Sequence, residues 1–305
     1  MNTRTRVLIA VVCFAGMLAG SIALVGKGIY GWTIFIALPF CAGGLTSWSV
    51  RPTTPTQALE VGALTGVIGS FSFLAFGMEG IICVLMALLP VVLLSMLGSW
   101  LVYALLSSNG SHTAGLALLL PVSFWFDLHA KPPVYSVRTS IVVNAPAERV
   151  WKYAVAFPDI EDQRDWVHRT GIAYPKRTRI VGTGVGAARY CDLSTGSVVE
   201  RVVVWDEPHK LQFLVTSTPP SMTEKGLYGR VYPKHLTGYF ISKQGQFTLT
   251  PLSHGRTLLE GTSWYQHGLW PAQYWRWWSD AIVHHIHVQV LEHIRRLAEQ
   301  EGTTN

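Results

Sequence analysis

Charged side chains are nearly absent from the first 126 residues of this 305-residue chain. The remainder holds 20 of the 24 Lys and Arg residues and 16 of the 18 Asp and Glu residues. A soluble domain usually carries about a quarter charged residues, so only the later part has a soluble composition. The chain therefore changes near residue 127 from an apolar part to a part with the composition of a soluble domain. The six early charges are Arg4, Arg6, Lys27, Arg51, Glu60 and Glu79.

Cysteine is scarce, and its positions exclude a disulfide within the charged part of the chain. Only Cys191 lies there. Cys13, Cys41 and Cys83 fall in apolar runs, where a thiol acts as a small packing residue. This usage fits a cytoplasmic location.

Several chemical signatures are missing as well. The sequence has no H-E-x-x-H pattern, no Ser/His/Asp arrangement, no Gly-rich phosphate loop and no Cys–His pairing. His284 and His287 have a spacing that can share a metal on one helical face, but no third ligand is evident. We therefore expect neither a metal nor a cofactor, and we expect these histidines to flank an apolar stripe.

Long apolar runs dominate the early part of the chain. A spanning helix needs about 20 apolar residues, because the hydrocarbon core is about 30 Å thick. We predict a transmembrane bundle of four spans, the first retained rather than cleaved as a signal peptide. Pro90 should kink the fourth, and Gly62 and Gly66 can let two helices pack closely. The spans are residues 7–25, 32–50, 58–76 and 81–105.

The Lys and Arg bias predicts the orientation of these spans. Arg4, Arg6 and Arg51 fall on the side of the N-terminus, which favours a cytoplasmic position for both ends of the bundle. Residues 114–126 are apolar but short for a span, so we expect a re-entrant or interfacial segment. If that segment crosses, the soluble domain lies outside. We expect an integral protein of a bacterial inner membrane whose soluble domain lies in the cytoplasm.

After a linker at residues 127–134, the pattern changes to strands and helices within a domain at 135–300. Pro146 suits the first turn of a helix that begins near residue 147, and residues 159–165 suggest a second short helix. A long helix at 271–299 carries one apolar face. We expect residues 217–236 to form a long loop, which in a compact domain is usually a lid, a binding loop or disordered. Strands are predicted at 135–143, 177–181, 185–193, 197–205, 211–216, 239–252 and 256–265.

Three stretches resemble the START-like (SRPBCC) superfamily, which includes polyketide cyclases, dehydrases and lipid-transfer proteins. They are IVVNAPAERVWKYAVAFPDIED at 141–162, GTGVGAARYCDLSTGSVVERVVVWDEPHKLQFLV at 182–215, and TLLEGTSWYQHGLWPAQYWRWWSDAIVHHIHVQVLEHI at 257–294. The last is similar to bacterial membrane-anchored members. The resemblance implies an α+β helix-grip domain, in which a curved antiparallel sheet wraps a long C-terminal helix and leaves an apolar cavity.

Few residues of the domain are candidates for chemistry. Glu200, Glu260 and Arg189 sit in apolar strands, where an inward orientation would form a buried polar cluster able to orient a ligand or transfer protons. Strand alternation can instead point them at solvent. Aromatic residues near 264–278 can roof the cavity, sit at the bilayer surface or simply pack in the core. The expected ligand-binding residues are Trp151, Tyr190, Phe213, Phe247, Trp264, Tyr274, Trp278 and His285.

The primary functional hypothesis is membrane-tethered binding or transfer of a hydrophobic small molecule or lipid, without catalysis. One alternative is a cyclase, dehydratase or hydrolase on the same scaffold. Another is a regulatory module that binds a protein. The expected partners are a lipid or apolar molecule and the membrane, with self-association possible. Nucleic acid is not expected, because the net charge of +6 has no Lys and Arg cluster with interleaved aromatics.

Overall fold

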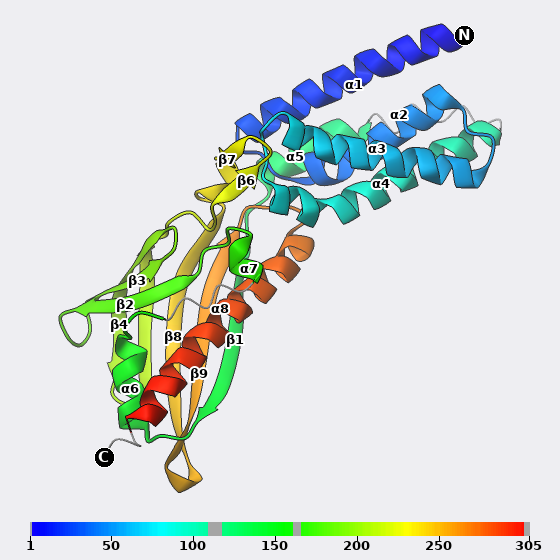
Figure 1. Cartoon of the computed structure of the whole chain (residues 1–305). Helices are drawn as coiled ribbons and strands as arrows, with labels where there is room; N and C mark the ends of the chain where they lie inside the picture. The colour runs from blue at the N-terminus through cyan, green and yellow to red at the C-terminus, as the bar shows by residue number, and fades with distance from the viewer. Residues whose placement is uncertain (1, 109–117, 161–165, 302–305) are drawn as a thin grey trace. The chain divides into compact units, whose positions relative to one another are not determined.

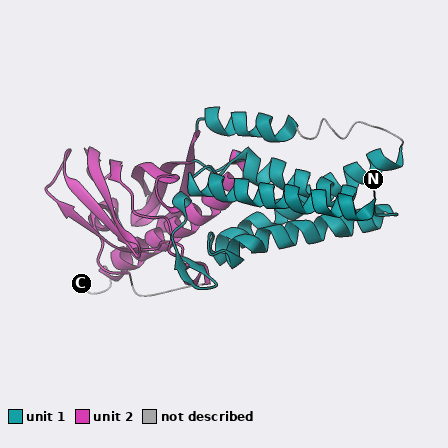
Figure 2. Ribbon diagram, turned by 90° about the horizontal axis from the view of Figure 1, so that it is seen from above, with its two compact units in different colours: residues 1–131, 224–235, 268–271 teal, residues 132–223, 236–267, 272–305 magenta. Residues whose placement is uncertain are grey.

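The computed structural model describes residues 2–108, 118–160 and 166–301 (Figure 1). The chain forms two compact units, shown in different colours in Figure 2. The first unit comprises residues 1–131, 224–235 and 268–271, and the second comprises residues 132–223, 236–267 and 272–305. Two short segments of the C-terminal half are therefore grouped with the N-terminal helices.

The first unit contains four helices that are long and apolar enough to cross a membrane, which confirms the four predicted runs. Many large apolar side chains remain exposed on these helices, such as Leu64, Leu89 and Leu97, as on a surface that faces lipid. The four are α1 (Thr3–Gly26), η1 with α2 (Thr33–Ala37 and Leu38–Val50), α3 (Pro55–Ala75) and α4 (Ile81–Ser107).

Small residues let α3 and α4 approach closely. A Cβ atom on Gly62 would lie 2.5 Å from the Cα of Met96, and one on Gly66 would lie 2.8 Å from the Cα of Val92. The hydroxyl of Ser99 on α4 donates a hydrogen bond to the carbonyl of Ala58 on α3 at 2.6 Å. The predicted Gly62–Gly66 pair thus packs two helices of the same chain, as small residues do in membrane bundles.

Helix α5 (Leu119–His129) contains the described part of the short apolar segment, whose residues 114–117 lie outside the described ranges. The carboxylate of Asp127 accepts hydrogen bonds from the backbone N–H groups of Trp32 at 2.6 Å and Thr33 at 2.9 Å. This caps the start of η1, where free N–H groups favour a negative charge. The C-terminal end of α5 therefore meets the turn that joins the first two spans.

The predicted loop at 217–236 is instead partly ordered into a hairpin. Strands β6 (Glu224–Gly226) and β7 (Gly229–Val231) pair antiparallel, and the short helix η3 (Lys234–Leu236) follows. Residues 224–235 belong to the first unit, where the fully buried Glu224 accepts a hydrogen bond from the N–H of Gly80. A long-range polar contact of this kind leaves no signature in the local pattern, so the sequence predicted a loop where the structure has a hairpin held at the α3–α4 turn.

The second unit is a seven-stranded antiparallel sheet with a long helix against it, which confirms the helix-grip expectation. The strand order is β1-β9-β8-β5-β4-β3-β2. The strands are β1 (Val134–Val143), β2 (Pro175–Val181), β3 (Ala188–Leu193), β4 (Gly196–Asp206), β5 (Lys210–Ser217), β8 (Phe240–Leu252) and β9 (Arg256–His267). The helices are α6 (Ala147–Val155), α7 (Trp166–Arg169), the short η4 (Ser253–Gly255) and α8 (Ala272–Gln300).

The core of this unit lies between α8, α6 and one face of the sheet. Leu291 and Ile294 of α8 are buried against Leu259 of β9 and Leu249 of β8. The predicted helix at 159–165 falls mostly outside the described ranges, which resume with the four-residue α7. The fold thus gives the sheet an inner face, toward α8, and an outer face.

Candidate functional site

Strand alternation decides which side chains enter the interior of the second unit, because successive residues of a strand point to opposite faces. On β9 the buried Leu259 and Tyr265 face inward together with Gly261. The register pairs Gly261 with Phe247 of β8, so Phe247 lies on the same face. Candidates on the alternate positions of β9, such as Glu260, face outward.

One ion pair lies in this interior. Arg189 of β3 stands opposite Glu200 of β4 in the register, and the guanidinium Nη1 donates a short hydrogen bond to Oε2 of Glu200. Only 2% of Arg189 and 6% of Glu200 is exposed. The Nε of Arg189 also donates to the carbonyl of Val155 at 3.1 Å. Arg189 and Glu200 thus point inward and form a buried polar pair, as one of the two readings of the sequence expected.

Aromatic rings surround the guanidinium. Its carbon lies 4.6 Å from the ring centre of Phe213 and 5.6 Å from that of Phe247, within the range of cation–π attraction. Burial raises the pKa of the Glu200 carboxyl, although the Arg189 charge opposes the shift. Burial and the nearby Glu200 raise the pKa of the Cys191 thiol to about 12. The arrangement offers a charged, hydrogen-bonding group inside an apolar interior.

Histidines of α8 form a second polar group on the sheet side. The hydroxyl of Thr139 shares hydrogen bonds with Nδ1 of His284 at 2.8 Å and Nδ1 of His287 at 3.2 Å. Nε2 of His287 shares a hydrogen bond with the hydroxyl of Ser263 at 2.8 Å. Burial, with the neighbouring His284, lowers the pKa of His287 to about 4, so this ring is neutral at physiological pH.

His285, an expected ligand residue, lies on another side of α8. Its ring centre is 5.5 Å from that of His168 on α7. Gln289 connects the two, because its Oε1 shares a hydrogen bond with His168 at 2.8 Å and its Nε2 one with His285 at 3.4 Å. The structure therefore separates His285 from the Arg189–Glu200 pair and places it in a contact between α7 and α8.

The other seven expected ligand residues divide into three groups. Trp151, Phe213 and Phe247 meet in the apolar core. Tyr190 and Trp264 lie on strand positions next to inward residues and so face outward, Tyr190 beneath the guanidinium of Arg179 at 5.3 Å. Tyr274 and Trp278 lie on the early turns of α8, where Trp275 is buried.

Glu260 does not join Glu200. It lies on the outer face of β9, where its carboxylate is 3.6 Å from the guanidinium of Arg138 on β1. The Arg138 side chain is 72% exposed. The pair Arg138–Glu260 is therefore a surface ion pair, and of the three charged candidates the described structure brings together Arg189 and Glu200.

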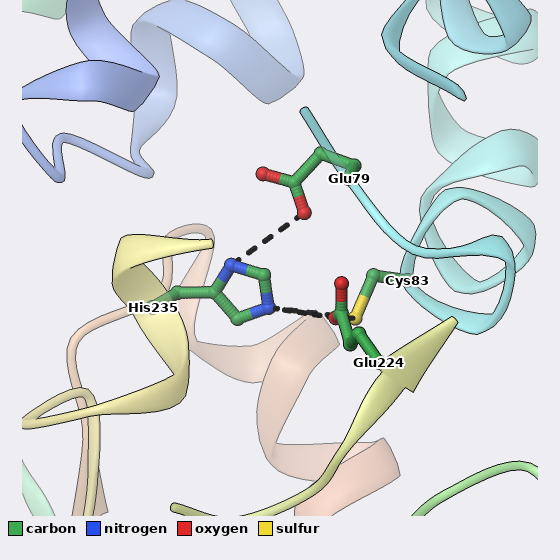
Figure 3. A group of neighbouring side chains, drawn as sticks. All are labelled: Glu79, Cys83, Glu224 and His235. Carbon is green, nitrogen blue, oxygen red and sulfur yellow. Dashed lines mark hydrogen bonds and ion pairs between the residues drawn. The ribbon is translucent and has the colours of Figure 1, made fainter. Parts of the chain in front are cut away.

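Sequence reasoning missed a polar cluster in the first unit. Glu79, Cys83, Glu224 and His235 lie together there (Figure 3). From the sequence, Glu79 is only one of the six early charges and Cys83 is expected as a packing residue. Glu224 is separated from Cys83 by 141 positions, and neither the spacing nor the local pattern connects them. No signal in the sequence could have found this cluster.

Comparison with known proteins identifies the sheet domain. Residues 135–266 match the family described as polyketide cyclase / dehydrase and lipid transport. No curated protein matches the chain. Solved structures similar to it include a protein from Nitrosospira multiformis, with 19% identity and a TM-score of 0.35, over 53% of this chain and 94% of that one.

Two enzymes are also among the similar structures. The Zhui aromatase/cyclase from Streptomyces sp. R1128 is 17% identical, with a TM-score of 0.35, over 55% of this chain and 95% of that one. A truncated norcoclaurine synthase from Thalictrum flavum is 12% identical, with a TM-score of 0.35, over 55% and 95% of the two chains. Residues 135–266 therefore form a polyketide cyclase/dehydrase and lipid transport domain of the START-like type, which follows four apolar helices.

Proposed function

We propose that this chain is a membrane-tethered protein whose helix-grip domain binds a hydrophobic small molecule or lipid with a polar head. The observation that carries the proposal is the buried Arg189–Glu200 pair beneath Phe213 and Phe247 on the inner face of the sheet. Aromatic and aliphatic side chains suit the apolar body of such a ligand, and the guanidinium offers donors to its head. The family description, which names lipid transport, supports the same class.

The cost of burying charge supports a role in recognition. Removing two charges from water costs several kcal/mol per ion, and replacing a buried pair with apolar residues is often neutral or stabilising. Stability alone therefore gives little reason for Arg189 and Glu200 to occupy the interior. A bound ligand whose polar head forms hydrogen bonds with Arg189 or Glu200 would give a reason for this pair to be buried.

The binding proposal is favoured over the enzyme alternative by the partners of Glu200. The Arg189 guanidinium occupies one oxygen of the Glu200 carboxylate, and an acid–base reaction needs a second titratable group placed beside it. Glu260, the other acidic candidate, lies on the outer face with Arg138. The membrane tether would favour binding, because a domain held at the bilayer meets a membrane-dissolved ligand at high local concentration.

We further propose that the domain lies on the side of the membrane opposite the N-terminus. The support is the contact of Asp127 with Trp32 and Thr33, which lie in the turn after the first span. Ser108, at the end of the fourth span, is on the side of the N-terminus when all four helices cross. Asp127, which contacts the turn after the first span, is then on the opposite side from Ser108. With Arg4 and Arg6 inside, this favours the outer side over the expected cytoplasmic location.

Ligand titration of the full chain in lipid nanodiscs tests the binding proposal. The probes are a panel of fluorescent fatty acids and phospholipids. The double variant Arg189→Met/Glu200→Leu removes both interior charges together and so leaves no unpaired buried charge. The matched control is Arg138→Met/Glu260→Leu on the outer face.

We expect saturable binding of at least one probe by the wild-type chain, weakened about ten-fold or more in the interior variant and unchanged in the control, since one charged hydrogen bond is worth about 1.5–3 kcal/mol. Equal affinity of the two variants for every probe would remove the Arg189–Glu200 pair from recognition. Absence of saturable binding across the panel would contradict the ligand-binding proposal and favour the protein-binding alternative.

A further inference from the structure

Four side chains with metal-binding atoms converge in the first unit. Glu79 precedes α4, Cys83 lies in its first turn, Glu224 begins β6 and His235 lies in η3 (Figure 3). One ligand atom from each residue lies within 4.8 Å of the others. Nε2 of His235 is 3.1 Å from Oε1 of Glu224 and 3.4 Å from Sγ of Cys83, while its Nδ1 is 3.6 Å from Oε2 of Glu79.

A second layer of hydrogen bonds holds both carboxylates in place. The hydroxyl of Tyr30 donates to Oε1 of Glu79 at 2.8 Å, and the N–H of Gly80 donates to Oε2 of Glu224 at 2.7 Å. In each carboxylate the remaining oxygen faces His235 and the centre of the group. Support of this kind, in which outer partners orient the ligand atoms, is what metal sites in proteins possess.

The charges of the cluster are poorly balanced without a cation. Glu224 is fully buried, and Glu79 and His235 are nearly so. In the described part of the chain, the ion pairs of both carboxylates are with the single imidazole of His235, which carries at most one positive charge. Two buried carboxylates that share one such partner carry a large desolvation cost, and a divalent cation between them would remove most of it.

We propose that Glu79, Cys83, Glu224 and His235 bind a divalent transition-metal ion of the zinc class. A thiolate and an imidazole select zinc and similar borderline metals, whereas Mg²⁺ and Ca²⁺ take oxygen ligands only. Four protein ligands without an open position characterise a structural rather than a catalytic site. Tetrahedral zinc with oxygen, nitrogen and one sulfur ligand spaces its ligand atoms by about 3.3–3.6 Å, so separations of up to 4.8 Å need to contract by about 1.5 Å at most.

Such an ion would fasten the β6–β7 hairpin to the helices. Two of its ligands come from the α3–α4 turn and the start of α4, and two come from the segment at 224–235. A metal bond that joins segments so distant in sequence restricts the unfolded chain and stabilises the folded one. This inference is independent of the proposed ligand in the second unit.

The test measures metal bound to the full-length chain, purified in detergent with an affinity tag that lacks histidine. We expect about one equivalent of zinc by elemental analysis, and about one equivalent of Co²⁺ after chelation and reloading. Because a thiolate ligand is present, bound Co²⁺ should show a sulfur-to-cobalt charge-transfer band in the near ultraviolet. This measurement on the wild-type chain needs no variant that must fold.

Matched variants then locate the ion. Cys83→Ser should abolish the charge-transfer band, and His235→Ala should lower the zinc content at least several-fold. Cys41→Ser and His254→Ala, which remove a thiol and an imidazole elsewhere, should leave both unchanged. A wild-type chain that retains less than about 0.1 equivalents of either metal after reloading overturns the proposal, as does an unchanged band in Cys83→Ser.

Discussion

At the scale of single residues, Arg189 and Glu200 illustrate how much a buried charge depends on its partner. Removing one member of a buried pair leaves the other uncompensated and costs about 3–5 kcal/mol. We expect Glu200→Gln to lower the free energy of unfolding by about this amount, and the double variant Arg189→Met/Glu200→Leu to recover most of it. Chemical denaturation followed by tryptophan fluorescence measures both.

Glu260→Gln is the control for this prediction, because its partner Arg138 is exposed on the outer face. Surface ion pairs contribute about 0–1 kcal/mol, so this variant should unfold almost like the wild type. If Glu200→Gln and Glu260→Gln have equal effects, the two charges of the interior pair do not depend on each other in the way described.

The buried His287 should make the free energy of unfolding depend on pH. Its pKa in the folded chain is about 4, below its ordinary value of 6.5, because it is buried beside His284. The unfolded chain therefore binds the proton more readily, and the stabilisation present above pH 6.5 is lost as the pH falls toward 4. A pKa unit corresponds to about 1.4 kcal/mol, so the loss is on the order of 3 kcal/mol at most.

Unfolding of the wild type and of His287→Gln across pH 4 to 7 measures this effect, in buffers of equal ionic strength. The variant has no imidazole at this position and should show a shallower decline with falling pH. Identical slopes in the two proteins would contradict the assignment of the decline to His287.

The sequence could identify Arg189 and Glu200 as candidates but could not separate them from Glu260. All three lie in apolar strands with apolar residues at neighbouring positions, so alternation does not reveal which face is inward. On β9, for instance, Leu258 and Leu259 are consecutive, and only Leu259 is fully buried. The register with β8 and the packing of α8 decide the face, and both are tertiary properties.

At the scale of elements, α3 and α4 depend on glycine for their close approach. Gly62→Ala places a Cβ 2.5 Å from the Cα of Met96, so the helices must separate, and overpacking of this kind typically costs about 1–3 kcal/mol. We expect a lower thermal unfolding midpoint in detergent. Gly69→Ala on the same helix is the control, because its Cβ meets nothing within 4 Å, and the change should be neutral or slightly stabilising.

Element boundaries were largely predictable, because they follow from local patterns. The expected strand at 256–265 is β9 (Arg256–His267), and the expected helix at 271–299 is α8 (Ala272–Gln300). The hairpin of β6 and β7 was not predictable. Its strands have three residues each and no apolar alternation, and its position depends on the contact of Glu224 with Gly80.

At the scale of the whole molecule, the division into an apolar helical part and a charged sheet domain follows from composition alone. The uneven distribution of charge across residue 127 indicates it directly. The side of the membrane is harder to predict, because it rests on a few positive charges and on one short apolar segment. The topology proposed above rests on the contacts of Asp127 with Trp32 and Thr33.

Protease protection in spheroplasts, whose inner membrane is intact and accessible to externally added protease, tests this topology. A chain with distinct epitope tags at its two ends should lose the C-terminal tag to externally added protease and keep the N-terminal one. The reason is that the proposed topology puts Ser108 and Asp127, and with them the two ends of the chain, on opposite sides of the membrane. Protection of both tags, with digestion of both after permeabilisation, would return the domain to the cytoplasm.

The central claim is that the domain holds an apolar molecule at the Arg189–Glu200 pair. Native mass spectrometry of the full-length chain released from nanodiscs, with solvent extraction and identification of what it carries, tests this most directly. We expect about one tightly bound apolar molecule with a polar head in the wild type, and its loss from Arg189→Met/Glu200→Leu but not from Arg138→Met/Glu260→Leu. An empty wild-type chain, or the same molecule retained by the interior variant, would contradict it.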